Sequence, residues 1–170
     1  MTARPVSAAD GARARILVAG VGNLFLGDDG FGPEVARRLL VAGPVDGAKV
    51  VDFGIRGMHL AYELLDGYDV LVIADAVPRT STPGTLSLIE VSAGDLGGGE
   101  FDAHGMDPTA VLARLGDLGG SLPRTFVVGC EPAFLGEGIG LSEPVATAVD
   151  GAVSMVRDLV QRLAAPVGGR

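Results

Sequence analysis

Three long apolar runs restrict the fold of this chain more than any other feature of its sequence. Residues 16–21, 70–75 and 126–130 read ILVAGV, VLVIAD and FVVGC, with apolar or small residues at both odd and even positions. A strand that buries one face alternates apolar and polar side chains, whereas an uninterrupted apolar strand is buried on both faces. Such strands are typical of parallel sheets that helices cover on both sides. The runs therefore predict the interior of a parallel sheet.

Amphipathic helical segments are predicted between the apolar runs. Pro33 suits the first turn of a helix, because its missing N–H has no intrahelical partner there. The apolar residues of the four predicted helices are Val35, Leu39 and Leu40; Leu60, Leu64 and Leu65; Val111, Leu112 and Leu115; and Val145, Val149, Val153, Val156, Val160 and Leu163. Two further strands are predicted, at 50–52 and, nearer an edge, at 86–90. This alternation predicts an α/β fold: a three-layer α/β/α sandwich around a five-stranded, mostly parallel sheet.

Length and composition fit one domain. The chain has 170 residues, of which 48% are hydrophobic and 20% are charged, a balance that suits a globular domain with a sizeable core. We expect residues 1–14 to form a flexible N-terminal arm and residues 15–165 to form the domain. No apolar run approaches the ~20 residues that span a bilayer. The N-terminus lacks a signal-peptide core, so the expected location is the cytoplasm.

Charge and cysteine content exclude several classes of partner. The formal net charge is −8 and Lys49 is the only lysine, so the chain offers no basic face for nucleic acid or for an anionic membrane. Cys130 is the only cysteine, which rules out an intramolecular disulfide and any metal motif built on two cysteines.

Polar residues gather where the predicted strands end. Asp28 and Asp29 follow the first strand, Asp52 ends the second, and Asp75 ends the third. His104 precedes the helix that leads to the fifth strand, and that strand is followed by Glu131. Ligands of open α/β sheets bind beyond the carboxyl ends of the strands. We therefore expect the functional site at this edge.

Two carboxylates and one imidazole form a set that can hold a divalent metal. Asp29, Asp75 and His104 would leave coordination positions open for substrate or water, and imidazole suits nickel or zinc better than magnesium. Each residue also has a purely structural interpretation: Asp29 could stabilise the following helix, Asp75 could cap a loop, and His104 could bond within a loop. Asp52 could bond the backbone of its own turn. His59 on a helix face and Cys130 in a strand are better explained by structure than by chemistry.

The sequence resembles the hydrogenase maturation endopeptidases along nearly its whole length. The opening motif is Gly20-Val21-Gly22-Asn23-Leu24-Phe25-Leu26-Gly27-Asp28-Asp29-Gly30-Phe31-Gly32. The likeness continues in order at Asp52-Phe53-Gly54-Ile55-Arg56-Gly57, Ile73-Ala74-Asp75-Ala76, Pro83-Gly84-Thr85, His104, Gly129-Cys130-Glu131-Pro132 and Gly140-Leu141-Ser142. The first motif and the Ala-Asp-Ala strand end are the most specific parts.

The resemblance implies a fold, an activity and a site. It implies the phosphorylase/hydrolase-like α/β/α fold of peptidase family M52, and an endopeptidase that removes the C-terminal extension of the [NiFe] hydrogenase large-subunit precursor after nickel insertion. The metal-contacting positions of the family fall on Asp29, Asp75 and His104, and Asp52 matches a further acidic position. Nickel is expected to arrive with the substrate, with none tightly bound at rest. A monomer or weak homo-oligomer is expected.

Three other functions compete with this interpretation. A dinucleotide-binding Rossmann domain needs a third glycine where this chain has Phe25. A magnesium-binding phospho-receiver module would use Asp28, Asp29 and Asp75, but the only lysine precedes the second strand. A cysteine peptidase would pair Cys130 with His104.

Overall fold

The chain folds around a five-stranded sheet, which the apolar runs predicted. The computed structural model describes residues 13–92 and 108–164. Its strands are β1 (Ile16–Val21), β2 (Ala48–Gly54), β3 (Val70–Ala76), β4 (Leu86–Val91) and β5 (Arg124–Cys130), arranged in the order β2-β1-β3-β5-β4. Strands β2, β1, β3 and β5 are parallel to one another, and β4 pairs antiparallel with β5 at one edge. The mostly parallel sheet with β4 at its edge confirms the prediction.

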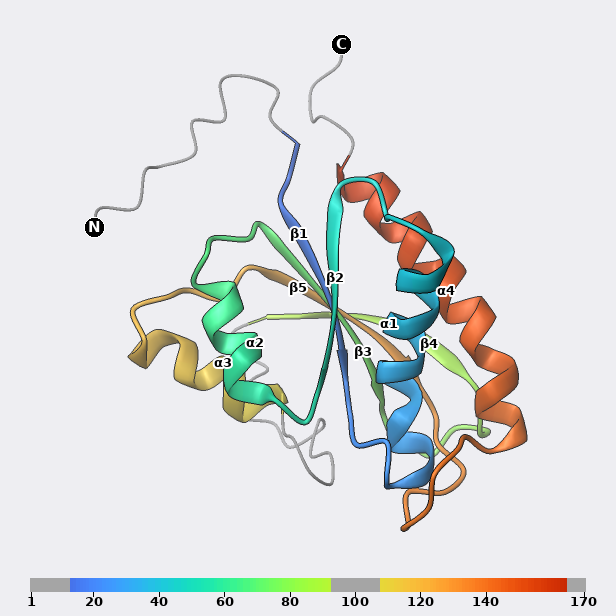
Figure 1. Cartoon of the computed structure of the whole chain (residues 1–170). Helices are drawn as coiled ribbons and strands as arrows, with labels where there is room; N and C mark the ends of the chain where they lie inside the picture. The colour runs from blue at the N-terminus through green and yellow to red at the C-terminus, as the bar shows by residue number, and fades with distance from the viewer. Residues whose placement is uncertain (1–12, 93–107, 165–170) are drawn as a thin grey trace.

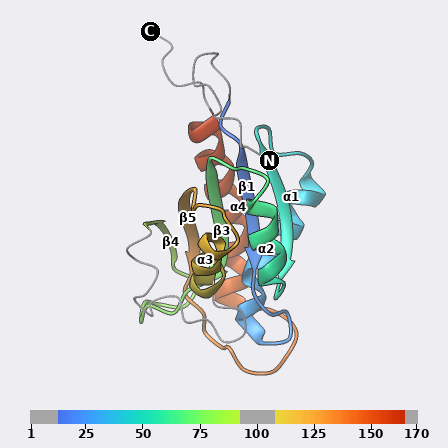
Figure 2. The ribbon, with the colours of Figure 1, turned by 90° about the vertical axis from the view of Figure 1, so that its left-hand side faces the viewer.

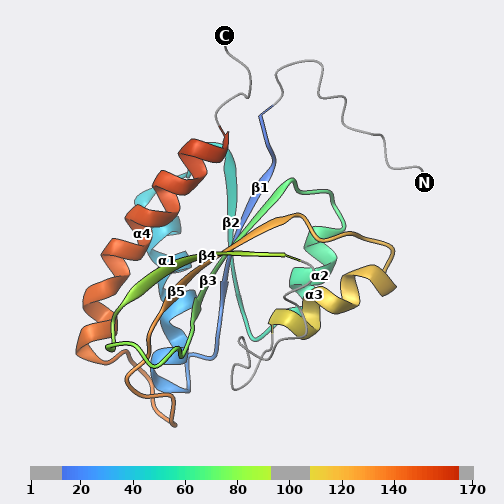
Figure 3. The same ribbon diagram turned by 180° about the vertical axis from the view of Figure 1, so that it is seen from behind.

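Helices cover both faces of this sheet and complete three layers (Figure 1). Helices α1 (Phe31–Ala42) and α4 (Glu143–Ala164) lie on one face, and α2 (Gly57–Leu64) and α3 (Pro108–Asp117) lie on the other. The view turned by 90° shows α2 and α3 in front of the sheet, and the view from behind shows α4 running along the opposite face (Figures 2 and 3). Among the described residues, no helix is both long enough and apolar enough to cross a bilayer.

Strands β1 and β3 are buried on both faces because their side chains alternate between two cores. Ile16 and Val18 pack toward α1 and α4, whereas Leu17 and Ala19 pack toward α2 and α3. All seven residues of β3 are buried, and Asp75 is the one polar residue among them. The sheet interior is therefore apolar until the carboxyl ends of the strands, where the first buried carboxylates appear.

The predicted helix stripes are largely confirmed. Val35, Leu39, Leu60 and Leu64 are buried, and so are the α4 residues Val145, Val149, Val156 and Val160. Leu40 and Leu65 were assigned to the same stripes but are exposed. Each immediately follows a buried leucine, and the 100° rotation per helical residue turns it away from the sheet. The proposed flexible arm falls mostly on residues 1–12, outside the described residues.

The first helix lies unusually close to the sheet. A Cβ on Gly32 would lie 2.2 Å from the carbonyl oxygens of both Val21 and Ala74, and a Cβ on Gly20 would lie 2.5 Å from the carbonyl oxygen of Gly32. Real Cβ atoms do not approach backbone oxygens this closely, so only glycine permits the contact. The start of α1, and the short segment before it, are thereby fixed directly over the ends of β1 and β3.

Substituting Gly32 with alanine should destabilise the domain strongly. The added methyl group must push α1 off the strands, and overpacking of this kind costs about 1–3 kcal/mol or more. Denaturant unfolding monitored by circular dichroism measures the change. Gly116→Ala is the matched control: Gly116 lies in α3 with open space around its Cβ position, so this substitution should be neutral or stabilising by up to about 1 kcal/mol. Equal stability of the Gly32→Ala protein and the unaltered chain would contradict the close-packing argument.

Candidate functional site

Two almost completely buried carboxylates lie at the carboxyl edge of the sheet. Asp75 is the penultimate residue of β3, paired in register with Gly129 of β5, and is 3% exposed. Asp29 lies in the short 3-10 helix η2 (Gly27–Gly30) between β1 and α1 and is 2% exposed. Because η2 packs against β3, the two residues predicted as metal contacts come from elements that touch each other.

The backbone of Asp29 is held against the end of β1. Gly22 follows β1 with φ of 142°, and a Cβ there would lie 1.9 Å from the carbonyl oxygen of Asp29. The N–H of Asn23 donates to Oδ2 of Asp29 at 2.7 Å. The Gly-x-Gly-Asn sequence therefore provides the close approach and the donor that fix this carboxylate.

Asp52 lies at the same edge of the sheet but away from Asp75. It lies two residues before the end of β2, opposite Gly20 of β1, so one strand separates it from β3 and the two backbones are roughly 10 Å apart. Strand alternation directs Asp52 toward the α1 side, because its neighbour Phe53 packs into the α2 core. Burial raises the pKa of Asp52, and the Gly54 N–H and the Arg56 charge partly offset this rise. The bond from Gly54 agrees with the structural alternative for Asp52.

Only two of the three predicted metal contacts, Asp29 and Asp75, belong to the described residues. His104 lies outside the described residues, so its place relative to Asp29 and Asp75 stays a prediction. Within 13–92 and 108–164, no three His, Cys, Asp or Glu side chains form a group that could hold a metal ion. Asp52 therefore does not complete a metal site with Asp29 and Asp75. His59 is exposed on α2, as its structural interpretation expected.

Asp28 has a role that sequence reasoning did not identify. Its carboxylate is fully buried and accepts hydrogen bonds from the backbone N–H groups of Ala133, Phe134 and Ser142 and from the Ser142 hydroxyl. Burial acts to raise the pKa of Asp28, but these donors outweigh it and leave the pKa below its ordinary value. No local pattern reveals this role, because the donors lie more than 100 residues away.

Cys130 is the last residue of β5 and Glu131 follows it. The surroundings of both side chains are those of residues with a structural role. Burial, together with the negative charges of Asp28 and Glu131, raises the pKa of the Cys130 thiol to about 12. A thiol of this kind is protonated at neutral pH and is a poor nucleophile. The Glu131 carboxylate accepts the Arg79 N–H at 2.6 Å, so it closes the loop before β4. These contacts support the inert core thiol and disfavour a cysteine peptidase.

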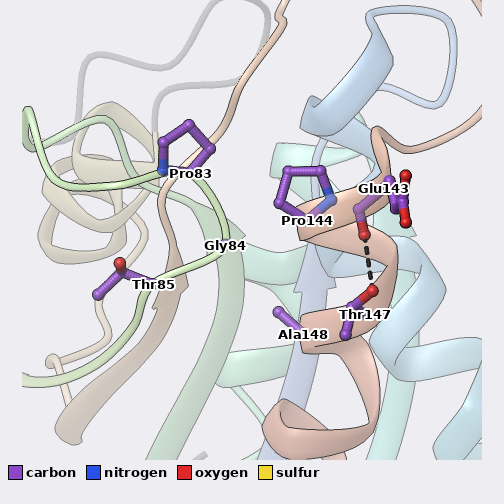
Figure 4. Close-up of a pocket in the computed structure, with 7 residues that line it drawn as sticks. All are labelled: Pro83, Gly84, Thr85, Glu143, Pro144, Thr147 and Ala148. Carbon is purple, nitrogen blue, oxygen red and sulfur yellow. Dashed lines mark hydrogen bonds between the residues drawn. The ribbon is translucent and has the colours of Figure 1, made fainter.

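A surface cavity of about 520 Å³ opens between the loop before β4 and the start of α4 (Figure 4). Its lining residues are Pro83, Gly84, Thr85, Glu143, Pro144, Thr147 and Ala148. The Thr147 hydroxyl donates to the Glu143 carbonyl and so is already engaged, as Figure 4 shows. None of the buried carboxylates lines this cavity. Asp29 and Asp75 are therefore better candidates for the functional site than this cavity is.

Comparisons with known proteins agree with this fold. The sequence model of the hydrogenase maturation protease family matches residues 33–159. A putative hydrogenase maturation protease of Methanocaldococcus jannaschii is 36% identical over 146 residues, which cover 83% of this chain and 93% of that protein. The hydrogenase 2 maturation protease of Escherichia coli is 32% identical, covering 84% of this chain and 88% of the relative. The solved hydrogenase maturating endopeptidase of E. coli superposes with a TM-score of 0.73 at 28% identity, covering 87% of this chain and 93% of that one.

The α/β/α sandwich of this chain is the architecture of solved hydrogenase maturation endopeptidases. The chain belongs to the hydrogenase maturation protease family. This membership confirms the resemblance of the sequence motifs, and it does not favour a Rossmann domain or a receiver module. The close helix–strand contact for which a dinucleotide-binding motif uses its third glycine is made here by Gly32.

Cys130 should be unreactive in the native protein and dispensable for processing. At pH 8 a thiol with a pKa of about 12 is almost wholly protonated, and this one is also buried. We expect no alkylation by iodoacetamide until the chain is unfolded with guanidinium, as followed by intact mass. Cys130→Ala should process its substrate at the rate of the unaltered chain. Loss of processing in a folded Cys130→Ala protein would support the alternative hypothesis of a cysteine peptidase.

Proposed function

We propose that this chain removes the C-terminal extension of a [NiFe] hydrogenase large-subunit precursor after nickel has been inserted. The observation that carries this proposal is the pair of buried carboxylates, Asp29 and Asp75, on contacting elements at the carboxyl edge of the sheet in a member of this protease family.

In this proposal Asp29, Asp75 and His104 contact the nickel that the precursor already holds. Carboxylate and imidazole donors suit a borderline divalent cation, and the buried carboxylates have little freedom to move away from it. The nickel is part of the substrate and not a resident cofactor of the enzyme. A precursor without nickel lacks the shared contact, and each ~1.4 kcal/mol of that contact gives tenfold discrimination.

Asp52 is the proposed general base. Its raised pKa and partly buried position suit a carboxylate that takes a proton from water at the edge of the sheet. Its separation from Asp75 supports a role outside the metal-contacting set. In this arrangement the peptide bond lies between the nickel, which polarises the carbonyl group, and the water that Asp52 activates.

Nickel loading should decide whether the precursor is cut. We expect the unaltered enzyme to shorten nickel-loaded precursor and to leave nickel-free precursor intact, as measured by intact mass. Asp75→Asn and His104→Ala should each slow processing by about 100-fold or more without unfolding the domain. His59→Ala is the matched control, because this exposed histidine of α2 is not one of the three proposed metal contacts. Processing of nickel-free precursor at the same rate would refute nickel recognition, and full activity of His104→Ala would refute the metal-contact set.

An apolar loop patch lies beside the carboxylates and fits a protein substrate. Its members are Leu24 (50% exposed), Phe25 (66%), Phe134 (57%) and Ile139 (80%). The patch combines two segments that are bonded to each other, because the N–H of Gly138 donates to the carbonyl of Phe25. Leu24 and Ile139 also line a cavity of about 320 Å³ beside η2. Clustered exposed apolar residues of this kind mark protein contacts more often than singly scattered ones do.

Polar substitutions in the apolar loop patch should weaken precursor binding. Phe25→Ser and Ile139→Ser are expected to raise KM for nickel-loaded precursor by about five- to tenfold each, with little change in kcat, because they remove contacts made before and during the reaction alike. Val41→Ser is the control: Val41 is 75% exposed but lies at the far end of α1. If Val41→Ser raised KM as much as the patch variants, the patch would have no specific role.

A further inference from the structure

We propose that Asp28 is a positioning residue, which holds η2 and therefore Asp29 in place by bonding the loop between β5 and α4. We call residues 131–142 the β5–α4 loop. The inference rests on the proposed function, in which Asp29 contacts the nickel of the precursor. It assigns to Asp28 a task distinct from that of its neighbour.

The carboxylate of Asp28 is saturated by this loop. Oδ2 accepts the N–H of Ala133 at 2.8 Å, the N–H of Phe134 at 3.0 Å and the hydroxyl of Ser142 at 2.8 Å. Oδ1 accepts the N–H of Ser142 at 2.7 Å. Hydrogen bonds to a charged acceptor in a water-excluded place are the strong ones. One side chain therefore joins both ends of the loop to η2.

Two backbone hydrogen bonds join the same two segments, and the carboxylate of Asp28 adds side-chain bonds to them. The N–H of Asp28 donates to the carbonyl of Phe134, and the N–H of Gly27 donates to the carbonyl of Gly138, both at 2.8 Å. The 3-10 helix η2 has only four residues and no side-chain N-cap. Because 3-10 segments this short have poor internal bond geometry, external contacts must fix their position.

The two adjacent aspartates of η2 bond to different parts of the structure. A 3-10 helix has three residues per turn, so consecutive side chains diverge by roughly 120°. Asp28 points toward the β5–α4 loop, and Asp29 bonds the N–H of Asn23 on the other side. A shift of η2 that releases Asp28 must also displace the carboxylate of Asp29. The Asn23–Asp29 bond thus reports the position of the metal-contacting group.

Asparagine cannot replace the Asp28 carboxylate. Its amide offers one acceptor oxygen and one NH₂ donor. With the oxygen at the Oδ2 position, the NH₂ group faces the N–H of Ser142; in the other orientation it faces three donors. Either orientation sets donor against donor in a buried place, so Asp28→Asn should release the loop while preserving the shape of the side chain.

The first measurement is amide hydrogen exchange at Asn23 in the full chain. If Asp28 positions η2, Asp28→Asn should speed exchange of this amide by about tenfold or more, because the bond to Asp29 opens more often. Val160→Ala is the matched control. It truncates a buried residue near the end of α4 and lowers global stability, but it should leave exchange at Asn23 unchanged under native conditions.

The second measurement is the division between kcat and KM with nickel-loaded precursor. Asp28→Asn should lower kcat per folded molecule by about tenfold or more with KM changed much less, because a contact to the reacting centre is misplaced. Val160→Ala should retain full kcat per folded molecule. Ser142→Ala removes one donor of four, so it should speed Asn23 exchange by only about two- to threefold. This variant carries the test if Asp28→Asn does not fold.

The outcomes separate this inference from the proposed function. Two outcomes would show that Asp28 only stabilises the fold and does not position Asp29. One is unchanged exchange at Asn23 in Asp28→Asn, and the other is an equal loss of kcat in Asp28→Asn and Val160→Ala. If exchange at Asn23 rises as expected but the unaltered chain leaves nickel-loaded precursor intact, Asp28 positions Asp29 and the proposed function fails.

Discussion

The contact between the start of α1 and the backbones of β1 and β3 determines where the site lies. Gly32 and Gly20 let the helix rest directly on the strands, and this contact leaves little freedom for η2, the turn that precedes it. Asp29 is consequently buried against the end of β1 and beside β3, where Asp75 emerges from the apolar sheet. The close packing of α1 on the strands, which involves no polar side chain, therefore holds both carboxylates in place. The chemistry of the site thus depends on the absence of side chains at two positions.

Much of the fold could be predicted because its signals are local. The runs at β1, β3 and β5 are apolar on both faces, and only a covered parallel sheet accommodates such strands. The carboxylates Asp29 and Asp75 could be located for the same reason, since parallel strands bring their carboxyl ends to one edge. Leu40 and Leu65 were misjudged because an apolar stripe has a width that periodicity does not define: each lies one residue past the buried face. Register and burial at such boundaries are settled by neighbours that the sequence does not identify.

Asp28 and Asp29 show what sequence reasoning could not separate. They are identical residues at consecutive positions and are similarly buried, yet one binds a loop more than 100 residues away and the other faces the end of β1. The difference follows from the geometry of a single helical turn. Ser142 illustrates the same point: it precedes α4 as a cap residue would, but its hydroxyl donates to Asp28. Non-local hydrogen bonds of this kind leave no periodic signal.

The antiparallel edge and the long last helix also constrain the order in which this chain can become folded. Strand β1 pairs with β3 across 54 residues, and β3 pairs with β5 across another 54, so the centre of the sheet needs distant segments. The α1 face stays partly uncovered until α4, the final described element, packs over β5 and β4. On the ribosome, an apolar surface therefore remains open until α4 has been synthesised. Nascent chains of this protein would need protection during that interval, because long-range parallel pairing is slow and exposes aggregation-prone strands.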